Sequence, residues 1–462
     1  MRYFRRRNSR LLVPGVLAAV VVVAVALVSA SMSSGATRAT PIKIGYISTC
    51  KGPFAPFYEA TLLGAVIALI DEGGKPAGAN PSNGVKGVTI GGHPVQQVYG
   101  CSDATPDVAL AEARRLIEQV KVDILVAPLS GSEGIAIANY SKTQPTKTFI
   151  NGTSGAQATT LDVRSPNFFR FNTDGAQWMA GFGDYAYNTL HWRKVVTIGD
   201  DYDFPYTQTA GFVAEFCALG GKVVNRIWPP LGNKDYSSYI AQIPKSGIDG
   251  FYLTVGGTGT VAFVKSYLQQ TTGNLSKKVL FGSVALDPIV VAQLGARVIG
   301  GVTGTPMAGD SGNPLAKKYI RESAKYYPKL AGAAYSLFSA DYWNNTWPVL
   351  EALKQVKGDL SGGEKGFRAA LNAYGKKGFN TPEGPTKLDQ NRQAIGNNYL
   401  IQLTSLKGGG TYKTIRTIPN VTEDFSGFFS PKTPKLSRTY PPCVKRTPPS
   451  WVGHFQSGPP KK

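Results

Sequence analysis

The sequence predicts an α/β fold made of two units with similar layout. Strand-like apolar runs alternate with helix-like runs from residue 42 to residue 150, and the alternation restarts at residue 195 and continues to residue 281. About 425 residues follow the N-terminal apolar run, which is enough for two domains. Such alternation is typical of parallel sheets with helices on both faces.

The predicted elements follow the chain in three sections. In the first, we expect strands at 42–47, 95–99, 124–127 and 148–150 and helices at 62–72, 106–120 and 135–141. In the second, we expect strands at 195–198, 222–228, 250–254 and 279–281 and helices at 207–219, 236–243 and 261–269. In the third, we expect helices at 315–326, 340–356 and 365–374 and strands at 386–388 and 399–403. Ligands of open α/β sheets bind beyond the carboxyl ends of the strands, so two facing sheets predict a site in the cleft between them.

The N-terminus has the pattern of an export signal. Five arginines and no acid occupy the first ten residues, residues 11–30 carry no charge, and small residues follow. This pattern predicts a signal over residues 1–36 that is cleaved, with the rest of the chain soluble and exported to the cell envelope or beyond. The alternative is a retained anchor, since roughly 20 apolar residues can span a bilayer. The absence of a cysteine near the end of the run argues against lipid attachment.

The net charge of +21 is concentrated at the two ends of the chain. Five positive charges lie in the first ten residues and seven follow Asp424, so removing these twelve leaves +9. With no basic stripe and no recognised motif, the sequence argues against a nucleic-acid partner. Residues 426–462 form a basic, Pro-rich tail that we expect to be extended and poorly ordered. It is either solvated or in contact with an anionic envelope.

Four cysteines are compatible with disulfides in an oxidising compartment. Cys50 and Cys101 each follow a predicted strand and can bridge if those strands are neighbours. Cys217 lies in an apolar helical stretch, where it is either a core thiol or a partner for Cys443. The sequence does not fix the connectivity. None of the four has zinc-site spacing, and we expect no metal and no cofactor.

Four stretches resemble the branched-chain amino-acid-binding family, the type I periplasmic binding proteins of ABC importers. They lie, in the family's order, at 42–74, 120–132, 167–181 and 384–403. The resemblance implies two Rossmann-like lobes joined by a three-crossing hinge, with crossings near 166–171, 302–307 and 385–391. Lobe one would comprise 42–165 plus 306–385, and lobe two 166–303 plus 390–425.

The resemblance also implies two polar ligand-binding loops in lobe one. Ser130, Gly131 and Ser132 would hold a ligand carboxylate at a helix start, where the helix dipole favours an anion. The alternative is an ordinary turn capped by serine. Glu133 would either cap the helix or point an acceptor at the ligand. A second loop would also donate to the ligand, unless it is a plain surface turn. Its residues are Thr153, Ser154 and Gly155.

Aromatic and glycine positions complete the expected site. Phe57 and Phe204 fall where the family often places an aromatic ring over the ligand, although either could serve packing alone. Tyr202 lies beside Phe204, in a segment that could instead be a solvated acidic turn. The segment Gly256-Gly257-Thr258-Gly259 stands where the family has an aromatic loop, and Gly257 either widens the pocket or lets backbone approach the ligand.

One position departs from the family pattern. Amino-acid-binding members carry an acid for the ligand ammonium where this chain has Val284. Asp287 is close in sequence but displaced, and Pro288 after it suggests that it opens a helix. A buried ammonium without a partner is costly. We therefore expect a small polar or carboxylate-bearing ligand rather than a plain α-amino acid.

Catalytic patterns are absent from the sequence. None of the three histidines lies beside a candidate nucleophile, and Ser132 lacks the first glycine of a nucleophile elbow. We expect no enzyme. The resemblance implies a monomeric binder that delivers a small molecule to the permease of an ABC importer. The alternatives are a sensor or co-receptor anchored by an uncleaved N-terminal segment, and a structural envelope protein without a ligand-ready cleft.

Overall fold

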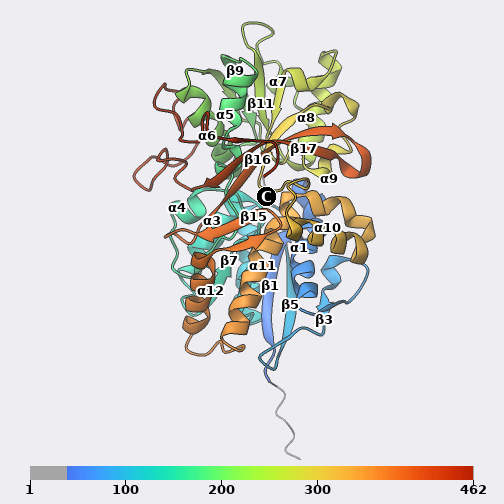
Figure 1. Cartoon of the computed structure of the whole chain (residues 1–462), viewed down its shortest axis with the longest axis vertical. Helices are drawn as coiled ribbons and strands as arrows, with labels where there is room; N and C mark the ends of the chain where they lie inside the picture. The colour runs from blue at the N-terminus through green and yellow to red at the C-terminus, as the bar shows by residue number, and fades with distance from the viewer. Residues whose placement is uncertain (1–38, 461–462) are drawn as a thin grey trace, which may run out of the picture. The chain divides into compact units, whose positions relative to one another are not determined.

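Two sheets organise residues 39–460, the part of the chain that the structure, a computed structural model, describes (Figure 1). The expected export signal lies outside the described residues. The first sheet has the order β4-β5-β1-β6-β7-β8, and its strands are parallel except for β4. Its strands are β1 (Ile42–Thr49), β4 (Thr89–Ile90), β5 (His93–Ser102), β6 (Ile124–Val126), β7 (Thr148–Ile150) and β8 (Phe168–Phe169). A separate pair joins β2 (Lys75–Pro76) to β3 (Val85–Lys86).

Helices from two distant parts of the chain cover this sheet. The third section returns to it, so that α11 (Leu337–Gln355) packs on α1 (Tyr58–Asp71) and lies beside the blue strands in Figure 1. A Cβ at Gly64 would lie 1.7 Å from the carbonyl oxygen of Ser339, so the two helices approach too closely for any other residue. The other helices of this half are α2 (Pro106–Arg114), α3 (Gly131–Ser141), α4 (Ala158–Leu161), α10 (Pro314–Tyr326) and α12 (Lys365–Lys377).

One described segment, Gly52–Asp71, is long and apolar enough by length and composition to cross a membrane. It comprises a 3-10 turn, Gly52–Phe57, followed by α1. All residues from Ala60 to Ile70 are buried in the core of the first half. A core helix of a globular domain satisfies the same criterion, and the packing of α1 fits that description.

The second sheet has the order β10-β9-β11-β12-β13-β16-β15-β14, with β17 on β16 and β18 on β17. Its strands are β9 (Lys194–Gly199), β10 (Lys222–Ile227), β11 (Gly250–Thr254), β12 (Val279–Phe281), β13 (Val302–Thr305), β14 (Phe379–Thr381), β15 (Gly384–Leu388), β16 (Ala394–Ser405), β17 (Thr411–Val421) and β18 (Gln456–Ser457). Its helices are α5 (Phe182–Asp184), α6 (Asp203–Ala218), α7 (Ser237–Ile240), α8 (Gly257–Gln270) and α9 (Pro288–Val291). The strands from β10 to β13 are parallel, and β16 is antiparallel to β13.

The chain leaves the first sheet after β8, returns after β13 to pack α10, α11 and α12 on the first half, and rejoins the second sheet through β14, β15 and β16. The lobe boundaries given above remain a prediction. Most of the predicted elements are present, but five helices begin three or four residues earlier than expected, at Tyr58, Gly131, Asp203, Gly257 and Leu337. Apolar periodicity does not detect a first turn that contains glycine or polar residues. β17 was not predicted, and it forms by pairing along β16.

Both disulfides are formed in the structure, which supplies the connectivity that the sequence left open. Cys50 pairs with Cys101 across the ends of β1 and β5, with their Cα atoms 5.4 Å apart. Cys217 in α6 pairs with Cys443 in the tail, with their Cα atoms 5.1 Å apart.

The prediction of a poorly ordered tail is wrong for the described residues 426–460. The disulfide of Cys443 ties the tail to α6, and β18 pairs with β17. The Trp451 ring is buried, and its Nε1 donates to Glu215 at 2.9 Å. Composition alone suggested disorder because an average over the tail does not reveal the effect of single residues such as Cys443 and Trp451.

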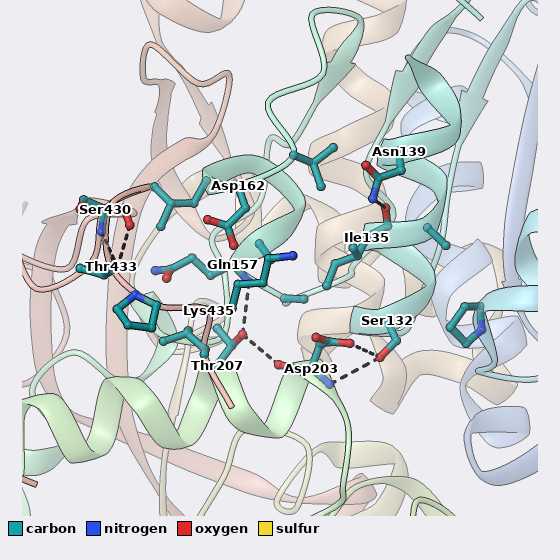
Figure 2. A pocket seen from close by; sticks show the side chains of 18 of the residues that line it. Ser132, Ile135, Asn139, Gln157, Asp162, Asp203, Thr207, Ser430, Thr433 and Lys435 are labelled. Carbon is teal, nitrogen blue, oxygen red and sulfur yellow. Dashed lines mark hydrogen bonds between the residues drawn. The ribbon is translucent and has the colours of Figure 1, made fainter. Parts of the chain in front are cut away.

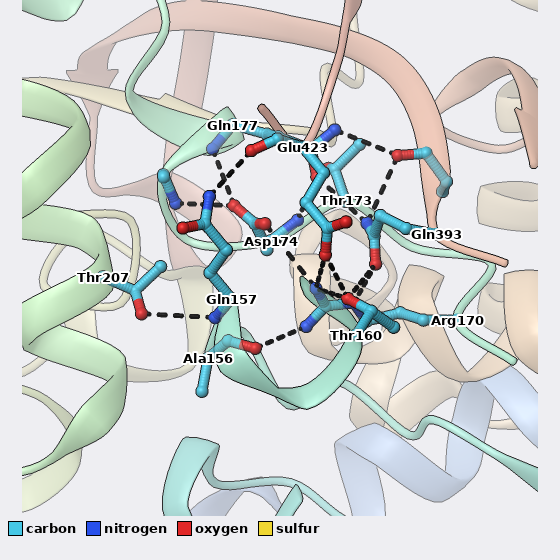
Figure 3. A network of polar contacts seen from close by, with 12 residues as sticks. Ala156, Gln157, Thr160, Arg170, Thr173, Asp174, Gln177, Thr207, Gln393 and Glu423 are labelled. Carbon is cyan, nitrogen blue, oxygen red and sulfur yellow. Dashed lines mark hydrogen bonds and ion pairs between the residues drawn. The ribbon is translucent and has the colours of Figure 1, made fainter. Parts of the chain in front are cut away.

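A buried polar network lies where the crossings meet (Figure 3). Arg170 follows β8 and is fully buried, with its guanidinium 3.6 Å from Asp174 and 3.4 Å from Glu423. It also donates to the carbonyl oxygen of Ala156 at 2.7 Å and to the side chain of Gln393. Burial raises the pKa of Asp174 to about 6 and that of Glu423 to about 8. The network therefore joins the first crossing to the third with little access to solvent.

Candidate functional site

A small cavity lies between the carboxyl ends of the strands of the two sheets. We call it the inner cavity. Its lining comes from both halves of the chain: Phe54, Leu129, Ser130, Gly131, Thr153, Gly155, Trp178, Tyr202, Phe204, Val284 and Phe338. Six of the eleven predicted ligand residues line it, namely Ser130, Gly131, Thr153, Gly155, Tyr202 and Phe204. These residues therefore meet at the carboxyl ends of the strands, where the sequence predicted the site.

The inner cavity is nearly filled by its own side chains. The space left is about 10 Å³, roughly what one water molecule needs. The two halves are held together beside it, where Ser132 Oγ donates to Asp203 Oδ2 at 2.6 Å. Any larger occupant therefore requires the halves to separate or the rings to turn.

Ser130 and Glu133 close the start of α3 from opposite directions. The backbone N–H of Ser130 donates to Glu133 Oε2 at 2.9 Å, and the Ser130 side chain accepts from the backbone N–H of Glu133. This reciprocal pair is a capping box. Burial raises the pKa of Glu133 to about 7. Of the two alternatives for Glu133, the structure shows the helix cap. The Ser130 hydroxyl itself donates to the carbonyl oxygen of Ala104 at 3.2 Å.

The second loop contributes unequally. Thr153 lines the inner cavity, but its hydroxyl donates to the buried carboxyl group of Asp341. Ser154 does not line the cavity, and its Oγ lies 3.5 Å from the carbonyl oxygen of Gly131. Gly155 does line it, and a Cβ there would lie 2.8 Å from the Phe204 ring. This loop thus brings backbone, rather than free hydroxyl groups, to the cavity.

Aromatic rings form most of the wall. Tyr202 lies with its ring centroid 6.5 Å from that of Phe54 and 6.3 Å from that of Phe204, which in turn is 5.6 Å from Trp178. Phe57 does not line the inner cavity. Its ring packs behind that of Phe338, with the two ring centroids 4.6 Å apart. Aromatic rings at these spacings bury a large area and exclude water.

Segment 201–203 is not a solvated acidic turn. Arg438 pairs with Asp201, and Asp203 accepts from Ser132. Both carboxylates are thereby engaged, and Tyr202 between them is turned to the inner cavity.

Gly257 plays a different part from the one expected. Its φ is +58°, which favours glycine, and a Cβ there would lie 2.3 Å from the carbonyl oxygen of Pro53. The backbone that approaches Gly257 is therefore that of the opposite half, and the glycine allows the cleft to close rather than widening it.

Asp287 is turned away from the inner cavity. Its Oδ1 accepts from the backbone N–H of Ile289 at 3.0 Å as the cap of α9, and its Oδ2 accepts from Ser336 at 2.7 Å. Burial raises its pKa to about 7. Val284, in contrast, lines the cavity. No charged side chain is among the lining residues, so nothing on the wall would pair with a ligand ammonium.

Helix starts supply the electrostatic character of the site. α3 begins at Gly131, α6 at Asp203 and α8 at Gly257, all at or beside the inner cavity. The first N–H groups of a helix have no partner within it, and the helix dipole adds partial positive charge there. The arrangement can accept an anionic group in an apolar, aromatic pocket. Within residues 39–460, no cluster of three or more His, Cys, Asp or Glu side chains could hold a metal ion.

Besides Val284, which the sequence singled out as a departure from the family pattern, four lining residues were not predicted. Phe54 lies one 3-10 turn before Phe57, so the aromatic expectation was displaced by three residues. Leu129 directly precedes the Ser130 loop. Trp178 lies within the segment 167–181 that resembles the family, and its large aromatic side chain in that segment could have indicated a lining residue. Phe338 comes from the start of α11, and no local pattern indicates that this distant helix reaches the cavity.

Two α/β units joined by three crossings, with a small cavity between them, define the class of two-lobed solute-binding proteins. Residues 41–410 match the periplasmic binding protein family. The chain belongs to that family, and it is a binding protein and not an enzyme. The α/β two-lobe fold and the family predicted from the sequence are thus confirmed.

The relatives are distant in sequence, but the alignments extend over nearly their whole length. A "Leu/Ile/Val-binding protein homolog 6" of Brucella melitensis is 23% identical over 397 residues, which are 85% of this chain and 95% of the relative. An ABC transporter substrate-binding protein from Sphaerobacter thermophilus is 24% identical with a TM-score of 0.67, covering 82% of this chain and 98% of its own.

Two further solved structures differ in what they bind. A solute-binding protein from R. palustris in complex with benzoate is 23% identical, with a TM-score of 0.69 and coverage of 80% and 95%. The leucine-binding protein LivK of Thermotoga maritima is 20% identical, with a TM-score of 0.68 and coverage of 82% and 99%. At these identities the structures are similar to this chain in fold alone.

Proposed function

We propose that this protein is an extracytoplasmic solute-binding protein that captures a small carboxylate without an ammonium group in the inner cavity. The proposal rests on one observation above the others: the lining carries aromatic rings and helix starts but no charged side chain. Helix starts favour the carboxylate, and no acid is present to pair with an amine.

The carboxylate would be held by backbone donors. The Ser130 and Thr153 hydroxyl groups already donate to protein acceptors. The N–H groups of Gly131 and Ser132, which precede the one that Ser130 caps at the start of α3, remain as natural donors. The rings of Tyr202, Phe204 and Trp178 would then enclose the apolar part of the ligand. Benzoate, the ligand of the R. palustris relative, is one molecule of this kind.

Capture would require a hinge movement. The cavity is closed in this structure, so the lobes would open about the crossings, admit the ligand and close again. The buried network around Arg170 would keep the crossings in register during this movement. The closed form would then be presented to the permease of an ABC importer, which is the partner we propose from the family.

A ligand screen tests the proposal. Thermal-shift measurements followed by calorimetry would compare benzoate, 4-hydroxybenzoate and 4-methylpentanoate with their amine counterparts benzylamine, tyramine and isoamylamine. We expect at least one carboxylate to raise the melting temperature and none of the amines to do so. Phe204→Ala should weaken carboxylate binding, whereas Val224→Ala, on an exposed position of β10, should leave it unchanged. Failure of all three carboxylates would contradict the proposal.

Export and processing need a separate experiment. The family implies export, and we propose that the segment up to about residue 36 is removed, as signal peptides are. N-terminal sequencing of the protein isolated from its cells would give a first residue near 37. A chain that still starts at Met1 in the membrane fraction would instead support the anchored sensor.

A further inference from the structure

A second, larger cavity lies back to back with the inner cavity (Figure 2). We call it the outer cavity. Its volume is about 500 Å³. Neighbouring residues of the same segments face the two cavities. Gly131 lines the inner cavity, and Ser132 lines the outer cavity. Tyr202 and Phe204 line the inner cavity, and Asp203 between them lines the outer cavity. The hydrogen bond between Ser132 and Asp203 therefore lies in the partition.

Three parts of the chain make the walls of the outer cavity. Lobe one contributes exposed faces of α3 and α4, and lobe two contributes the start of α6. The tail contributes the third wall, with Ser430, Thr433, Pro434, Lys435 and Leu436. The family match ends at residue 410, and the R. palustris and Thermotoga maritima relatives leave about a fifth of this chain uncovered while nearly all of their own is covered. The tail wall thus lies outside the stretch that matches the family.

The tail wall is held in place. Cys443 is bonded to Cys217, the Arg438 guanidinium pairs with Asp201, and the indole N–H of Trp228 donates to the carbonyl oxygen of Arg438 at 3.2 Å. These contacts fix the segment just after Lys435 to lobe two. The cavity is therefore formed before any ligand arrives, which reduces the entropy lost on binding.

Two opposite charges face this space without pairing. Figure 2 shows the Lys435 side chain pointing from the tail into the cavity, and the Asp162 carboxylate turned towards the same space from the end of α4. Among the described residues, neither side chain has a hydrogen bond or an ion pair. Burial raises the pKa of Asp162, and the positive charges of Lys435 and Arg164 oppose that shift. The other carboxylate on the wall, Asp203, is already engaged by Ser132.

Apolar side chains lie between and around these charges. Ile135, Leu161 and Leu436 line the cavity together with Val163. Lys142, directly after α3, adds a second ammonium to the lining. A complementary occupant would have an ammonium group, a carboxylate group and a short apolar body.

We propose that the outer cavity is a second ligand site that takes a small zwitterion, with its ammonium on Asp162 and its carboxylate on Lys435. Because the walls come from both lobes and from the tail, an occupant binds the closed arrangement better than an open one. By linkage, it then also strengthens binding at the inner cavity. The site does not depend on the proposed function of the inner cavity.

Calorimetry on the full disulfide-bonded protein tests the site with three zwitterions, L-leucine, γ-aminobutyrate and glycine betaine. We expect at least one to bind. Lys435→Gln and Asp162→Asn should each weaken that binding by about tenfold, the loss of one charge-assisted contact. Both substitutions should leave benzoate binding unchanged. Val284→Trp, which fills the inner cavity, should abolish benzoate binding and spare the zwitterion.

The outcomes separate the two sites. The proposal is overturned if none of the three zwitterions binds the wild-type protein. It is also overturned if a zwitterion binds the wild-type protein, its binding is abolished by Val284→Trp, and its affinity is unchanged by Lys435→Gln and Asp162→Asn. That result would place the zwitterion in the inner cavity. Failure of benzoate alone would count against the proposed function and not against the outer site.

Discussion

Ser132 at the start of α3 donates a hydrogen bond to Asp203 at the start of α6, with Oγ and Oδ2 2.6 Å apart. The backbone N–H of Asp203 lies 3.4 Å from the same Oγ. The two residues belong to different lobes, and they lie in the partition between the inner and outer cavities. A residue that we expected to touch the ligand thus links the lobes in the closed form.

Removing this link should favour the open form. Ser132→Ala deletes a hydrogen bond to a charged group, and at this partly exposed position we expect a loss of about 1 kcal/mol. The affinity for the tightest carboxylate of the ligand screen should fall about fivefold, and scattering should show a slightly larger unliganded protein. Calorimetry and small-angle X-ray scattering measure the two effects.

Ser154→Ala is the matched control for this prediction. Ser154 lies in the neighbouring loop, and its side chain makes one hydrogen bond among the described residues, at 3.5 Å to the carbonyl oxygen of Gly131 within the same lobe. Its loss should change neither quantity. If Ser154→Ala weakens binding and Ser132→Ala does not, the ligand contacts Ser154 directly and the link between the lobes is unimportant.

A second prediction concerns the position where the family pattern has an acid. Val284 lines the inner cavity, so an aspartate there would place a carboxylate against the ligand. Val284→Asp, in a Lys435→Gln background that removes the proposed outer site, should bind L-leucine, because the ammonium gains a partner. Without ligand the variant should melt at a lower temperature, since the new carboxylate is buried.

Val284→Asn in the same background isolates the charge. It has nearly the same size as aspartate and offers a carbonyl oxygen but no negative charge. We expect no leucine binding by calorimetry. Equal leucine affinities for the two variants would show that the missing acid does not determine ligand choice.

The sequence predicted the location of the inner cavity better than its composition. The rule that ligands bind at the carboxyl ends of strands led to the loops at Ser130 and Thr153, and both line the cavity. The rule says nothing about which way a side chain points. Both hydroxyl groups donate to protein acceptors on segments distant in sequence, Ala104 and Asp341, which no local pattern indicates. The cap at Asp287, in contrast, was indicated by Pro288 and is confirmed.

Long-range packing accounts for the remainder. Phe338 reaches the cavity only because α11 folds back against α1, and the sequence gives the helix but not that contact. The tail is the clearest case. Its composition predicts disorder, but Cys443 and Trp451 are two residues whose effect depends on partners in α6.

A third prediction concerns pH. Glu215 in α6 is fully buried, and burial raises its pKa from 4.5 to about 8. Between these values the folded protein keeps a proton that the unfolded chain has lost, so the contribution of this group is complete below about pH 4.5 and is lost as the pH rises towards 8. The free energy of unfolding should therefore fall between pH 5 and pH 8, and urea unfolding followed by circular dichroism would show it.

Glu215→Gln separates this group from other buried carboxyls. Glu423 and Glu133 also have raised pKa values and contribute slopes of the same sign. The glutamine has no proton to lose, so its profile should be flatter than that of the wild-type protein over the same range. Parallel profiles would mean that Glu215 does not titrate in this window.

The last prediction concerns the anchor of the tail. The Cys217–Cys443 bond closes a loop with a sequence separation of 226. Removing it by Cys217→Ser with Cys443→Ser should free the tail, with a loss of about 3 kcal/mol typical of a native disulfide. The tail carries Lys432, Lys435, Arg438 and Lys445, all trypsin sites. We therefore expect trypsin to cut the tail much faster, while the lobes remain resistant.

The other disulfide provides the control. Cys50→Ser with Cys101→Ser removes a bond between β1 and β5, which lie in the first sheet and make no part of the tail's attachment. This variant should be less stable than the wild-type protein, but its tail should be cut at the wild-type rate. Equal cleavage of the tail in both double variants would show that Trp451, β18 and the Arg438–Asp201 pair hold it without the disulfide.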